Sequence, residues 1–430
     1  MAKSSLAKTG FFSLWAAESV SLAGSQITLF ALPLVAVLTL DAGAWEMGLL
    51  TTAGSLSILL FGLSIGVWVD RFERRNLMLL ANAVRGLAVL SVPVFFWLDS
   101  LSLGLLLLVA FVVGAMSLLF DSAMVPYLPR LVGKDDISRA NSWMQGTQSV
   151  GDVAGPGVGG VLVQIMSAPV VLVVDAVSYL ISSVILGRLP KAAPLKGETD
   201  SGDSHGAAVR AGLKMLWGSP ILRPLALAAA HFNIFTAVFF ALFTLYAVRV
   251  LGFSVFLIGV ITTVSGVAGL LGSAAAVRLG NRFGLGRVML ISYAVPGLAG
   301  LLVPFAENRG AVVGAVMVGT GLFVWTFFVV ILLIMGMSLQ QQLVPDAYLG
   351  RVSSSFRFIS WGVEPVGGLV AGVLGTSLLG LRGTLIVASV GIALSALWPL
   401  FGPVRTLREV PSGAGYEAVS DPAHSRGTEN

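Results

Sequence analysis

The chain reads Leu131-Val132-Gly133-Lys134-Asp135-Asp136-Ile137-Ser138-Arg139-Ala140-Asn141-Ser142, and this pattern returns 212 positions later as Leu343-Val344-Pro345-Asp346-Ala347-Tyr348-Leu349-Gly350-Arg351-Val352-Ser353-Ser354. Leu, Val, Arg and Ser recur in register without a gap. The same offset places Asp152 on Glu364, Gly155 on Gly367 and Gly160 on Gly372. A short basic connector followed by a Gly-rich apolar helix therefore occurs once per half, which indicates a chain built from two related halves.

The composition is that of a membrane protein. Hydrophobic residues make up 56% of the chain and charged residues 11%, whereas ordinary globular proteins are about a quarter charged. The 51 glycines also suit membrane helices, because small residues let neighbouring backbones approach closely. The chain has no cysteine, which excludes a disulfide framework and a thiolate metal site. An internal repeat in such a chain is typical of a transporter made of two pseudo-symmetric bundles.

Apolar segments of about 20 residues, the length that crosses a bilayer, occur twelve times. The predicted spans are 11–40, 46–69, 76–98, 101–122, 138–165, 168–188, 221–249, 255–277, 287–305, 311–336, 347–378 and 382–403. Prolines inside them are expected to kink the helices rather than end them, because neighbours can satisfy the freed carbonyls; these are Pro33, Pro93, Pro156, Pro296 and Pro365. The sequence thus predicts an all-α membrane protein of two six-helix bundles.

Lysine and arginine are concentrated in alternate connections between the spans. One set holds Arg71, Arg74, Arg75, Arg130, Lys134, Arg139, Arg278, Arg282 and Arg287, whereas the other holds only Arg249, Arg309 and Arg382. The positive-inside rule places the first set in the cytoplasm. We therefore expect a multi-pass protein of the cell (inner, cytoplasmic) membrane with both termini in the cytoplasm.

These spans divide the chain into four parts. Residues 1–190 form the first bundle and 221–405 the second, joined by a cytoplasmic linker over 191–220. The linker begins polar and charged, and its later part from Ala211 to Pro220 has an amphipathic pattern suited to a membrane surface. Residues 406–430 read as a disordered cytoplasmic tail.

The loop Gly66-Val67-Trp68-Val69-Asp70-Arg71-Phe72-Glu73-Arg74-Arg75 resembles the G-x-x-x-D-R-x-G-R-R motif of the major facilitator superfamily, with Glu73 in place of the usual glycine. This resemblance implies the major facilitator fold and makes Gly66, Asp70, Arg71, Arg74 and Arg75 candidates for a gating loop. Asp70 could cap a helix N-terminus while the arginines bind carboxylates or lipid phosphates. The alternative is that the arginines are only topology signals.

Further motifs resemble the branch of enterobactin exporters and macrolide-efflux proteins. They are Val125-Pro126-Tyr127-Leu128-Pro129-Arg130, Arg139-Ala140-Asn141-Ser142, Gly155-Pro156-Gly157-Val158-Gly159-Gly160, Leu216-Trp217-Gly218-Ser219-Pro220 and Ser360-Trp361-Gly362-Val363-Glu364-Pro365. The resemblance implies an efflux carrier. The stretch with Gly155, Pro156, Gly159 and Gly160 also resembles the antiporter motif, in which small residues allow close helix packing.

Acids inside membrane spans are costly and usually face a cavity or a partner, so they are candidates for carrying protons. Glu18 is the leading candidate because the first helix borders the central cavity in the fold that the chain resembles. Asp152 and Glu364, at equivalent positions of the two halves, are further candidates. Asp121 is another, and the resemblance also suggests that it is a charge partner of the Arg71–Arg75 loop. The alternative for Glu18 is an acid at a helix end near the membrane surface.

Two other groups within the spans require an explanation. Arg85 needs a carboxylate or carbonyl partner, and we expect Arg85 and Asp175 to serve in structural charge pairing. His231, Asn233, Phe235 and Trp325 are candidates to line an aromatic substrate cavity, although aromatic residues in membrane helices more often face lipid or pack. No His, Asp and Glu cluster has metal-ligand spacing.

No phosphate-binding loop and no hydrolase motif is present, so the sequence predicts neither an ATPase nor an enzyme with catalytic residues. We expect a drug/proton antiporter that exports a hydrophobic or amphipathic molecule, such as an antibiotic, macrolide or siderophore, by alternating access. Its partners would be the substrate, protons and membrane lipid, with no nucleic acid and no cofactor beyond the proton gradient, and it would act as a monomer. The alternatives are an uptake symporter and a non-transporting sensor on the same fold.

Overall fold

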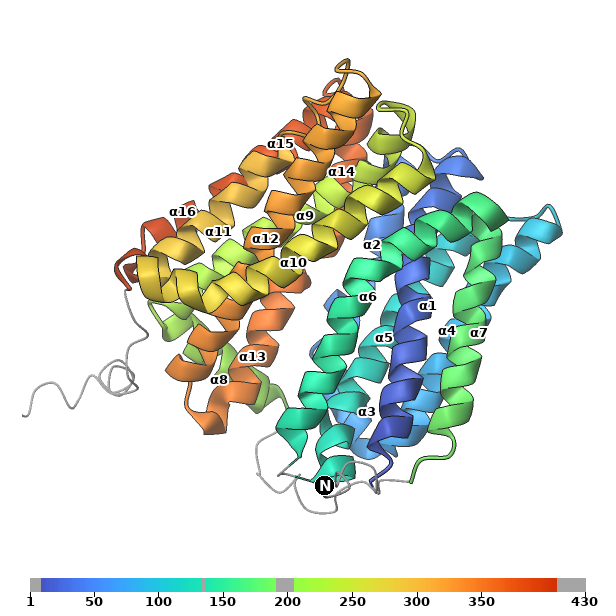
Figure 1. Cartoon of the computed structure of the whole chain (residues 1–430). Helices are drawn as coiled ribbons and strands as arrows, with labels where there is room; N and C mark the ends of the chain where they lie inside the picture. Colours follow the sequence, from blue (N-terminus) through green and yellow to red (C-terminus); the bar gives the residue numbers. More distant parts are fainter. Residues whose placement is uncertain (1–8, 134–135, 191–204, 408–430) are drawn as a thin grey trace, which may run out of the picture.

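The structure is a computed structural model that describes residues 9–133, 136–190 and 205–407. Its regular secondary structure within these ranges is entirely helical. Figure 1 shows two bundles of long helices lying side by side. The predicted all-α fold of two helical bundles is confirmed.

The first bundle contains seven helices, listed here with their bounds: α1 (Phe11–Leu38), α2 (Ala44–Phe61), α3 (Ile65–Arg71), α4 (Arg74–Trp97), α5 (Leu103–Val132), α6 (Ile137–Met166) and α7 (Ala168–Leu186). Within it α1 packs against α6 and α7, and α4 packs against α5 and α7. Pro33, Pro93 and Pro156 lie inside α1, α4 and α6, so these prolines are accommodated within helices as predicted.

The second bundle follows α8 (His205–Gly218) and contains α9 (Leu222–Arg249), α10 (Val255–Phe283), α11 (Leu285–Gly300), α12 (Ala311–Leu343), α13 (Asp346–Trp361), α14 (Glu364–Thr376), α15 (Gly380–Leu394), α16 (Leu397–Leu400) and the 3-10 helix η3 (Pro403–Thr406). Here α10 packs against α12, while α9 packs against α14 and α15. Pro296 lies inside α11, again as predicted.

Eleven helical stretches in the described ranges are long and apolar enough to cross a membrane, and the shorter apolar helix Leu285–Gly300 brings the candidates to the twelve predicted. Two predicted spans are interrupted. The span 46–69 is divided between α2 and α3, and the span 347–378 breaks between Trp361 and Glu364. Proline cannot donate a hydrogen bond to the carbonyl of Trp361, and Pro365 lies in the first turn after this interruption. Gly362 and Val363 keep right-handed helical backbone angles, so the span continues from Tyr348 to Thr376 and does not end at the proline, as predicted.

The predicted linker is in part a docked helix. Helix α8 packs on α13, and a Cβ at Gly212 would lie 2.5 Å from the carbonyl oxygen of Arg351, so only glycine fits this contact. Leu216 of α8 is fully buried. The amphipathic face of the linker thus packs against protein. Residues 191–204 of the linker and 408–430 of the tail lie outside the described residues.

The two bundles meet most closely at the end of the molecule that carries the loop between α1 and α2; we call this the Asp41 end, and the opposite end, where α1 begins, the N-terminal end. Glycines permit the approach. A Cβ at Gly48 of α2 would lie 2.5 Å from the carbonyl oxygen of Gly368 of α14, and a Cβ at Gly160 of α6 would lie 3.1 Å from Gly259 Cα of α10.

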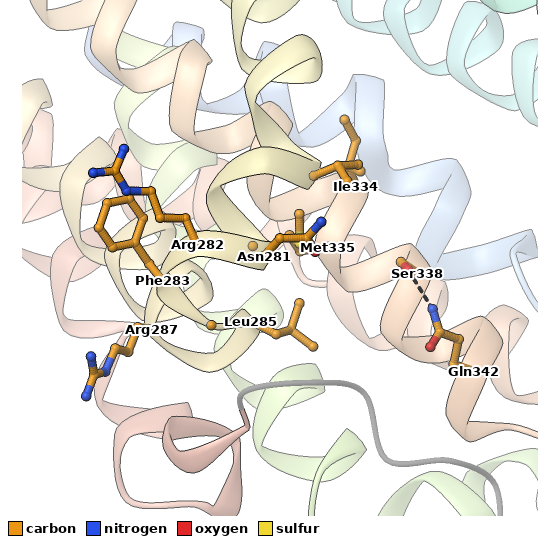
Figure 2. A pocket seen from close by; sticks show the side chains of 12 residues that line it. Asn281, Arg282, Phe283, Leu285, Arg287, Ile334, Met335, Ser338 and Gln342 are labelled. Carbon is orange, nitrogen blue, oxygen red and sulfur yellow. Dashed lines mark hydrogen bonds between the residues drawn. The ribbon is translucent and has the colours of Figure 1, made fainter.

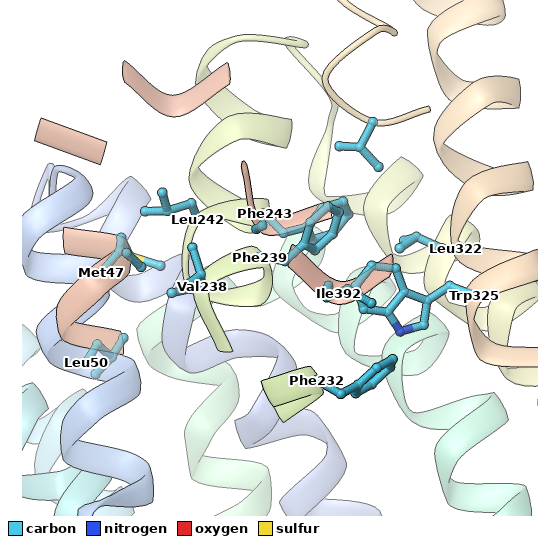
Figure 3. Packing of buried hydrophobic residues seen from close by; sticks show 14 of the residues in the cluster. Met47, Leu50, Phe232, Val238, Phe239, Leu242, Phe243, Leu322, Trp325 and Ile392 are labelled. Atoms are coloured by element: carbon cyan, nitrogen blue, oxygen red, sulfur yellow. The ribbon is translucent and has the colours of Figure 1, made fainter. Parts of the chain in front are cut away.

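Apolar packing reinforces this contact. Figure 3 shows Met47 and Leu50 of α2 beside Val238 and Leu242 of α9, within a hydrophobic cluster that continues into the second bundle. At the N-terminal end, by contrast, a cavity of about 410 Å³ separates the bundles; Gly62 is among the residues that line it on one side and Phe358 on the other. The structure is therefore closed at the Asp41 end.

Candidate functional site

A cavity of about 1030 Å³ lies between α1, α5 and α6 in the first bundle. Its polar lining comes mainly from α6 and consists of Ser138, Asn141, Ser142, Gln145, Thr147 and Gln148. Its apolar lining includes Leu22, Met124 and Met144, which are flexible or branched side chains that adapt to ligand shape. Among the described residues, Glu18 is the one charged residue of this lining.

Glu18 is half-buried on α1, and its Oε2 is buried without a hydrogen-bond partner in the structure. A buried polar atom of this kind is costly and calls for an explanation such as a role in function. Asp121 of α5 and Arg85 of α4 are close enough to act on Glu18 electrostatically. The leading acid predicted from the sequence thus lines a cavity with one oxygen available to a ligand or a proton.

Arg85 is buried, but it does not form the expected ion pair with Asp175. Its guanidinium lies over the rings of Phe120 at 4.7 Å and Tyr179 at 4.6 Å, and it donates hydrogen bonds to Asn82 Oδ1 and Ser117 Oγ. Asp175 instead accepts hydrogen bonds from hydroxyl groups. Two aromatic faces satisfy the cation, so a carboxylate is not required.

Asp175 is fully buried between α1 and α7. Thr28 and Ser178 donate hydrogen bonds to its carboxylate, the latter at 3.0 Å. A Cβ at Gly24 would lie 2.4 Å from Asp175 Oδ1, so α1 approaches α7 closely at this point. Asp175 therefore joins two helices of the same bundle.

The other candidate acids lie in three different environments. Asp152 of α6 accepts hydrogen bonds from the side-chain amides of Gln26 at 2.7 Å and Gln148 at 2.8 Å. Asp121 is exposed on α5 and lies within electrostatic range of Arg357 on α13, across the bundle interface. Glu364 is half-buried in the first turn of α14. The structure brings Glu18 and Asp121 within electrostatic range of each other, and it links Asp152 to the cavity through Gln148, which lines it.

The predicted aromatic cavity is not formed by the expected residues. Trp325 is 4% exposed and packs against Phe232 and Phe239 in the core of the second bundle (Figure 3). His231 accepts a hydrogen bond from Trp398 Nε1 at 3.1 Å, and its ring lies 5.1 Å from that of Phe235. The side chain of His231 thus faces α16 and that of Phe235 faces α15. This direction follows from the rotation of α9 about its axis.

Asn233, the fourth predicted lining residue, has a structural partner. Its side-chain amide donates a hydrogen bond to the carbonyl oxygen of Ser360 at 2.8 Å. This carbonyl lies in the last turn of α13, just before the break at residues 362–363. Asn233 therefore supports an interrupted span.

The aromatic residues beside the cavity come instead from the first bundle and were not among the predicted lining residues. Trp15 and Trp143 contact edge to face at 5.3 Å, and Trp15 Nε1 donates a hydrogen bond to Thr147 Oγ1 at 2.8 Å. Together they line a neighbouring cavity of about 600 Å³. A signal was available, because Trp15, Glu18 and Leu22 fall on one face of a helix, as do Asn141, Gln145 and Gln148.

The loop with the gating motif has a role within one bundle. Arg75 donates hydrogen bonds to the carbonyl oxygens of Leu189 at 2.8 Å and Gly187 at 2.7 Å, just after α7. Arg74 is buried, whereas Arg71 and Gly66 are exposed. Arg75 thus joins α4 to the end of α7, and no described carboxylate makes the expected contact with it. The side chain of Asp70 lies outside the described residues.

The glycines of the predicted packing motif face two partners. Gly155 and Gly159 approach Gln26 and Phe30 of α1, whereas Gly160 approaches α10 of the other bundle together with the carbonyl of Pro156. In residues 9–133, 136–190 and 205–407, no three His, Asp or Glu side chains gather in a way that could hold a metal ion.

The geometry is that of two helical bundles closed at one end, with a polar cavity in the first bundle that is lined in part by Glu18. The sequence model of the Major Facilitator Superfamily matches residues 14–363. The chain belongs to the major facilitator superfamily. The fold agrees, because the nucleoside transporter NupG superposes with a TM-score of 0.74 at 14% identity, covering 91% of this chain and 99% of that one.

Among characterised superfamily members, the chain is similar to two efflux proteins. It is 26% identical to macrolide efflux protein A of Streptococcus pyogenes over 189 residues, which is 43% of this chain and 46% of the relative. It is also 26% identical to the multidrug efflux pump Tap of Mycolicibacterium fortuitum, over 48% of this chain and 51% of the relative. The chain spans about half the length of the curated relatives it matches.

Proposed function

We propose that this protein is a proton-coupled exporter of hydrophobic or amphipathic small molecules. The observation that carries the proposal is the position of Glu18. Among the described residues it is the one acid lining the cavity between α1, α5 and α6, and its Oε2 has no hydrogen-bond partner there. Such a group can be neutralised by a proton or by a cationic substrate, but not by both at once. Competition between the two couples their movement.

The cavity suits a sizeable amphipathic molecule. Its volume of about 1030 Å³ is at the upper end of the range of about 300–1,000 Å³ that is common for small-molecule sites. Side-chain amides on α6 provide hydrogen bonds, and Met124 of α5 and Met144 of α6 provide apolar contact. The similarity to macrolide and multidrug efflux proteins supports an antibiotic-like substrate.

In the mechanism that we propose, the bundles rock about the cavity so that it opens to one side of the membrane at a time. The arginine-rich connections support an orientation in which the N-terminal end faces the cytoplasm and the protein lies in the cell membrane. The observed closure at the Asp41 end then makes this the inward-facing state. The substrate enters from the cytoplasm, and a proton from outside replaces it on Glu18. We propose that one chain performs this cycle without a cofactor.

The test is efflux of a panel of hydrophobic antibiotics and dyes from cells that express the wild type, Glu18→Gln or the control Asp99→Asn. Asp99 is an exposed loop acid with a positive φ, a conformation that asparagine tolerates. We expect efflux that a protonophore abolishes, that Glu18→Gln removes and that Asp99→Asn retains. Protonophore-sensitive efflux by Glu18→Gln would refute its role, and accumulation of the compounds would indicate uptake instead.

A further inference from the structure

A second cavity, of about 880 Å³, lies in the second bundle at the N-terminal end of the molecule, where α10 ends, α11 begins and α12 passes (Figure 2). It shares no lining residue with the cavity that contains Glu18. Its polar lining consists of Asn281, Arg282, Arg287, Ser338 and Gln342. The proposed transport mechanism gives this cavity no role.

The cavity carries positive charge that no described residue neutralises. Within residues 9–133, 136–190 and 205–407, neither Asp nor Glu lines it, and both Arg282 and Arg287 are exposed. In the described part of the chain, neither guanidinium forms a hydrogen bond or ion pair with another residue. Arg282 lies 5.3 Å from the ring of Phe283, a contact that orients the side chain while leaving its N–H groups available. Two cations are therefore free to bind an anion.

The corresponding loops of the two bundles are held by different groups. In the first bundle, Arg75 secures the loop by binding the carbonyls of Gly187 and Leu189. In the second bundle the backbone does this, because the N–H of Gly286 donates to the carbonyl oxygen of Leu407 at 2.9 Å. A Cβ at Gly286 would lie 1.9 Å from the carbonyl oxygen of Val404, so this docking is tight without any arginine.

The cavity also has an apolar side. Ile334, Ser338 and Gln342 are spaced by four residues and share one face of α12, which changes from apolar to polar toward the helix end. Val277 of α10, 61% exposed, and Ile334 form the apolar wall. The arginines and this wall together fit an amphiphile with an anionic head.

We propose that this cavity binds an anionic phospholipid. The guanidinium groups of Arg282 and Arg287 hold the headgroup phosphate, and Asn281 adds a hydrogen-bond donor. An acyl chain follows Val277 and Ile334 toward the apolar outer surface of α10 and α12. A free phosphate ester shares the headgroup chemistry but makes no use of the apolar wall.

The test is native mass spectrometry of the full chain in neutral detergent, titrated with phosphatidylglycerol, with phosphatidylcholine of the same acyl chains, or with glycerol phosphate. The double variant Arg282→Gln/Arg287→Gln is compared with Arg188→Gln/Arg223→Gln, which removes two exposed arginines outside the cavity. Size-exclusion chromatography checks that each variant is folded. We expect one saturable phosphatidylglycerol site that the cavity variant weakens about 30-fold, since each arginine near a membrane surface contributes about 5-fold.

Phosphatidylcholine should bind more weakly than phosphatidylglycerol, and the control variant should bind phosphatidylglycerol like the wild type. If Arg282→Gln/Arg287→Gln and Arg188→Gln/Arg223→Gln bound phosphatidylglycerol equally well, the proposed lipid site would be wrong. Binding of glycerol phosphate as tight as that of phosphatidylglycerol would overturn the assignment to lipid and would indicate a soluble phosphate ester.

Discussion

At the scale of single residues, Arg85 shows how a cation is held inside a membrane-spanning bundle. Its partners are two aromatic faces and two neutral oxygens. We expect Arg85→Lys to lower stability by about 2 kcal/mol or more, because a lysine cannot stack on Phe120 and Tyr179 and bind both oxygens at once. Thermal unfolding followed by intrinsic fluorescence measures the change. The exposed Arg188→Lys is the control, and an equal melting temperature for the two variants would contradict this role.

The sequence could identify Glu18 and Arg85 as important, because charges in apolar spans are costly wherever they occur. It could not identify their partners. Phe120 and Tyr179 reach Arg85 from α5 and α7, and that meeting depends on how three helices pack. The direction in which His231 and Trp325 point likewise depends on helix rotation, which is why the predicted aromatic cavity was wrong.

At the scale of helices, the contact between α2 and α14 depends on glycine. A Cβ at Gly48 would lie 2.5 Å from Gly368 O and 2.7 Å from Gly372 N, both of them backbone atoms. We therefore expect Gly48→Ala to separate the bundles at the Asp41 end. The chain contains no cysteine, so spin labels can be placed on Ser100→Cys and Arg309→Cys, in exposed loops of the two bundles, without further changes. Their distance distribution, measured by pulsed electron spin resonance, should shift to longer values.

Gly54→Ala is the matched control, because it lies on the same helix and a Cβ there meets no atom within 4 Å. It should leave the distance distribution unchanged, and a small rise in helix stability of about 1 kcal/mol is expected for both substitutions. If Gly48→Ala and Gly54→Ala gave the same distances, close packing at Gly48 would not control closure.

The helices themselves were largely predictable, because an apolar run of about 20 residues signals a span without any tertiary information. The positions at which helices are interrupted were not predicted. Both predicted spans that break do so near glycines, at Gly62 and Gly362, and the second break is supported by the hydrogen bond from Asn233 on another helix. Pro365 marks the second break locally, whereas the supporting hydrogen bond from Asn233 depends on helix packing and leaves no local pattern in the sequence.

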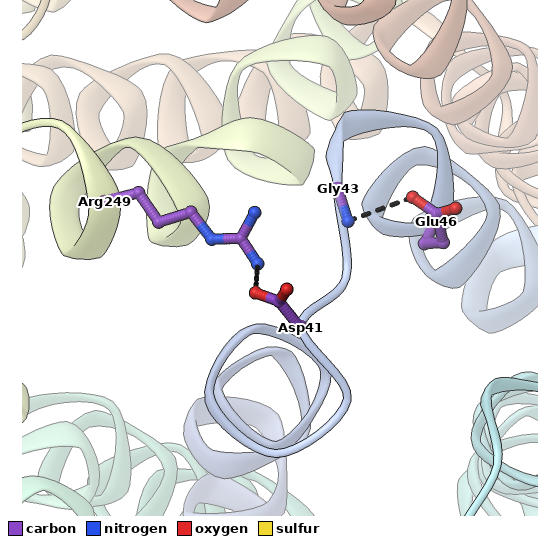
Figure 4. Close-up of polar contacts among 4 residues, drawn as sticks. All are labelled: Asp41, Gly43, Glu46 and Arg249. Atoms are coloured by element: carbon purple, nitrogen blue, oxygen red, sulfur yellow. Dashed lines mark hydrogen bonds and ion pairs between the residues drawn. The ribbon is translucent and has the colours of Figure 1, made fainter.

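At the scale of the whole molecule, one ion pair joins the bundles across the Asp41 end. Nη2 of Arg249, in the last turn of α9, lies 2.5 Å from Oδ1 of Asp41, in the loop between α1 and α2 (Figure 4). The loop is fixed locally, because Glu46 Oε2 accepts a hydrogen bond from the N–H of Gly43 at 2.9 Å. The side chain of Asp41 is 95% exposed, so the pair is worth less than about 1 kcal/mol.

Even this small energy matters when two states of the molecule are close in free energy. We expect Asp41→Asn and Arg249→Gln each to shift the populations of the closed and open Asp41 end by up to about 5-fold toward the open form, measured with the same spin labels. Asparagine preserves the positive φ of 53° at position 41, so the substitution removes charge without straining the loop. Because the two side chains act as a pair, the double variant should shift no further than either single variant.

High salt should weaken the closed form of the wild type and leave the double variant unaffected. Additive shifts in the double variant would show that Asp41 and Arg249 act independently, and closure would then rest on the glycine and apolar contacts alone.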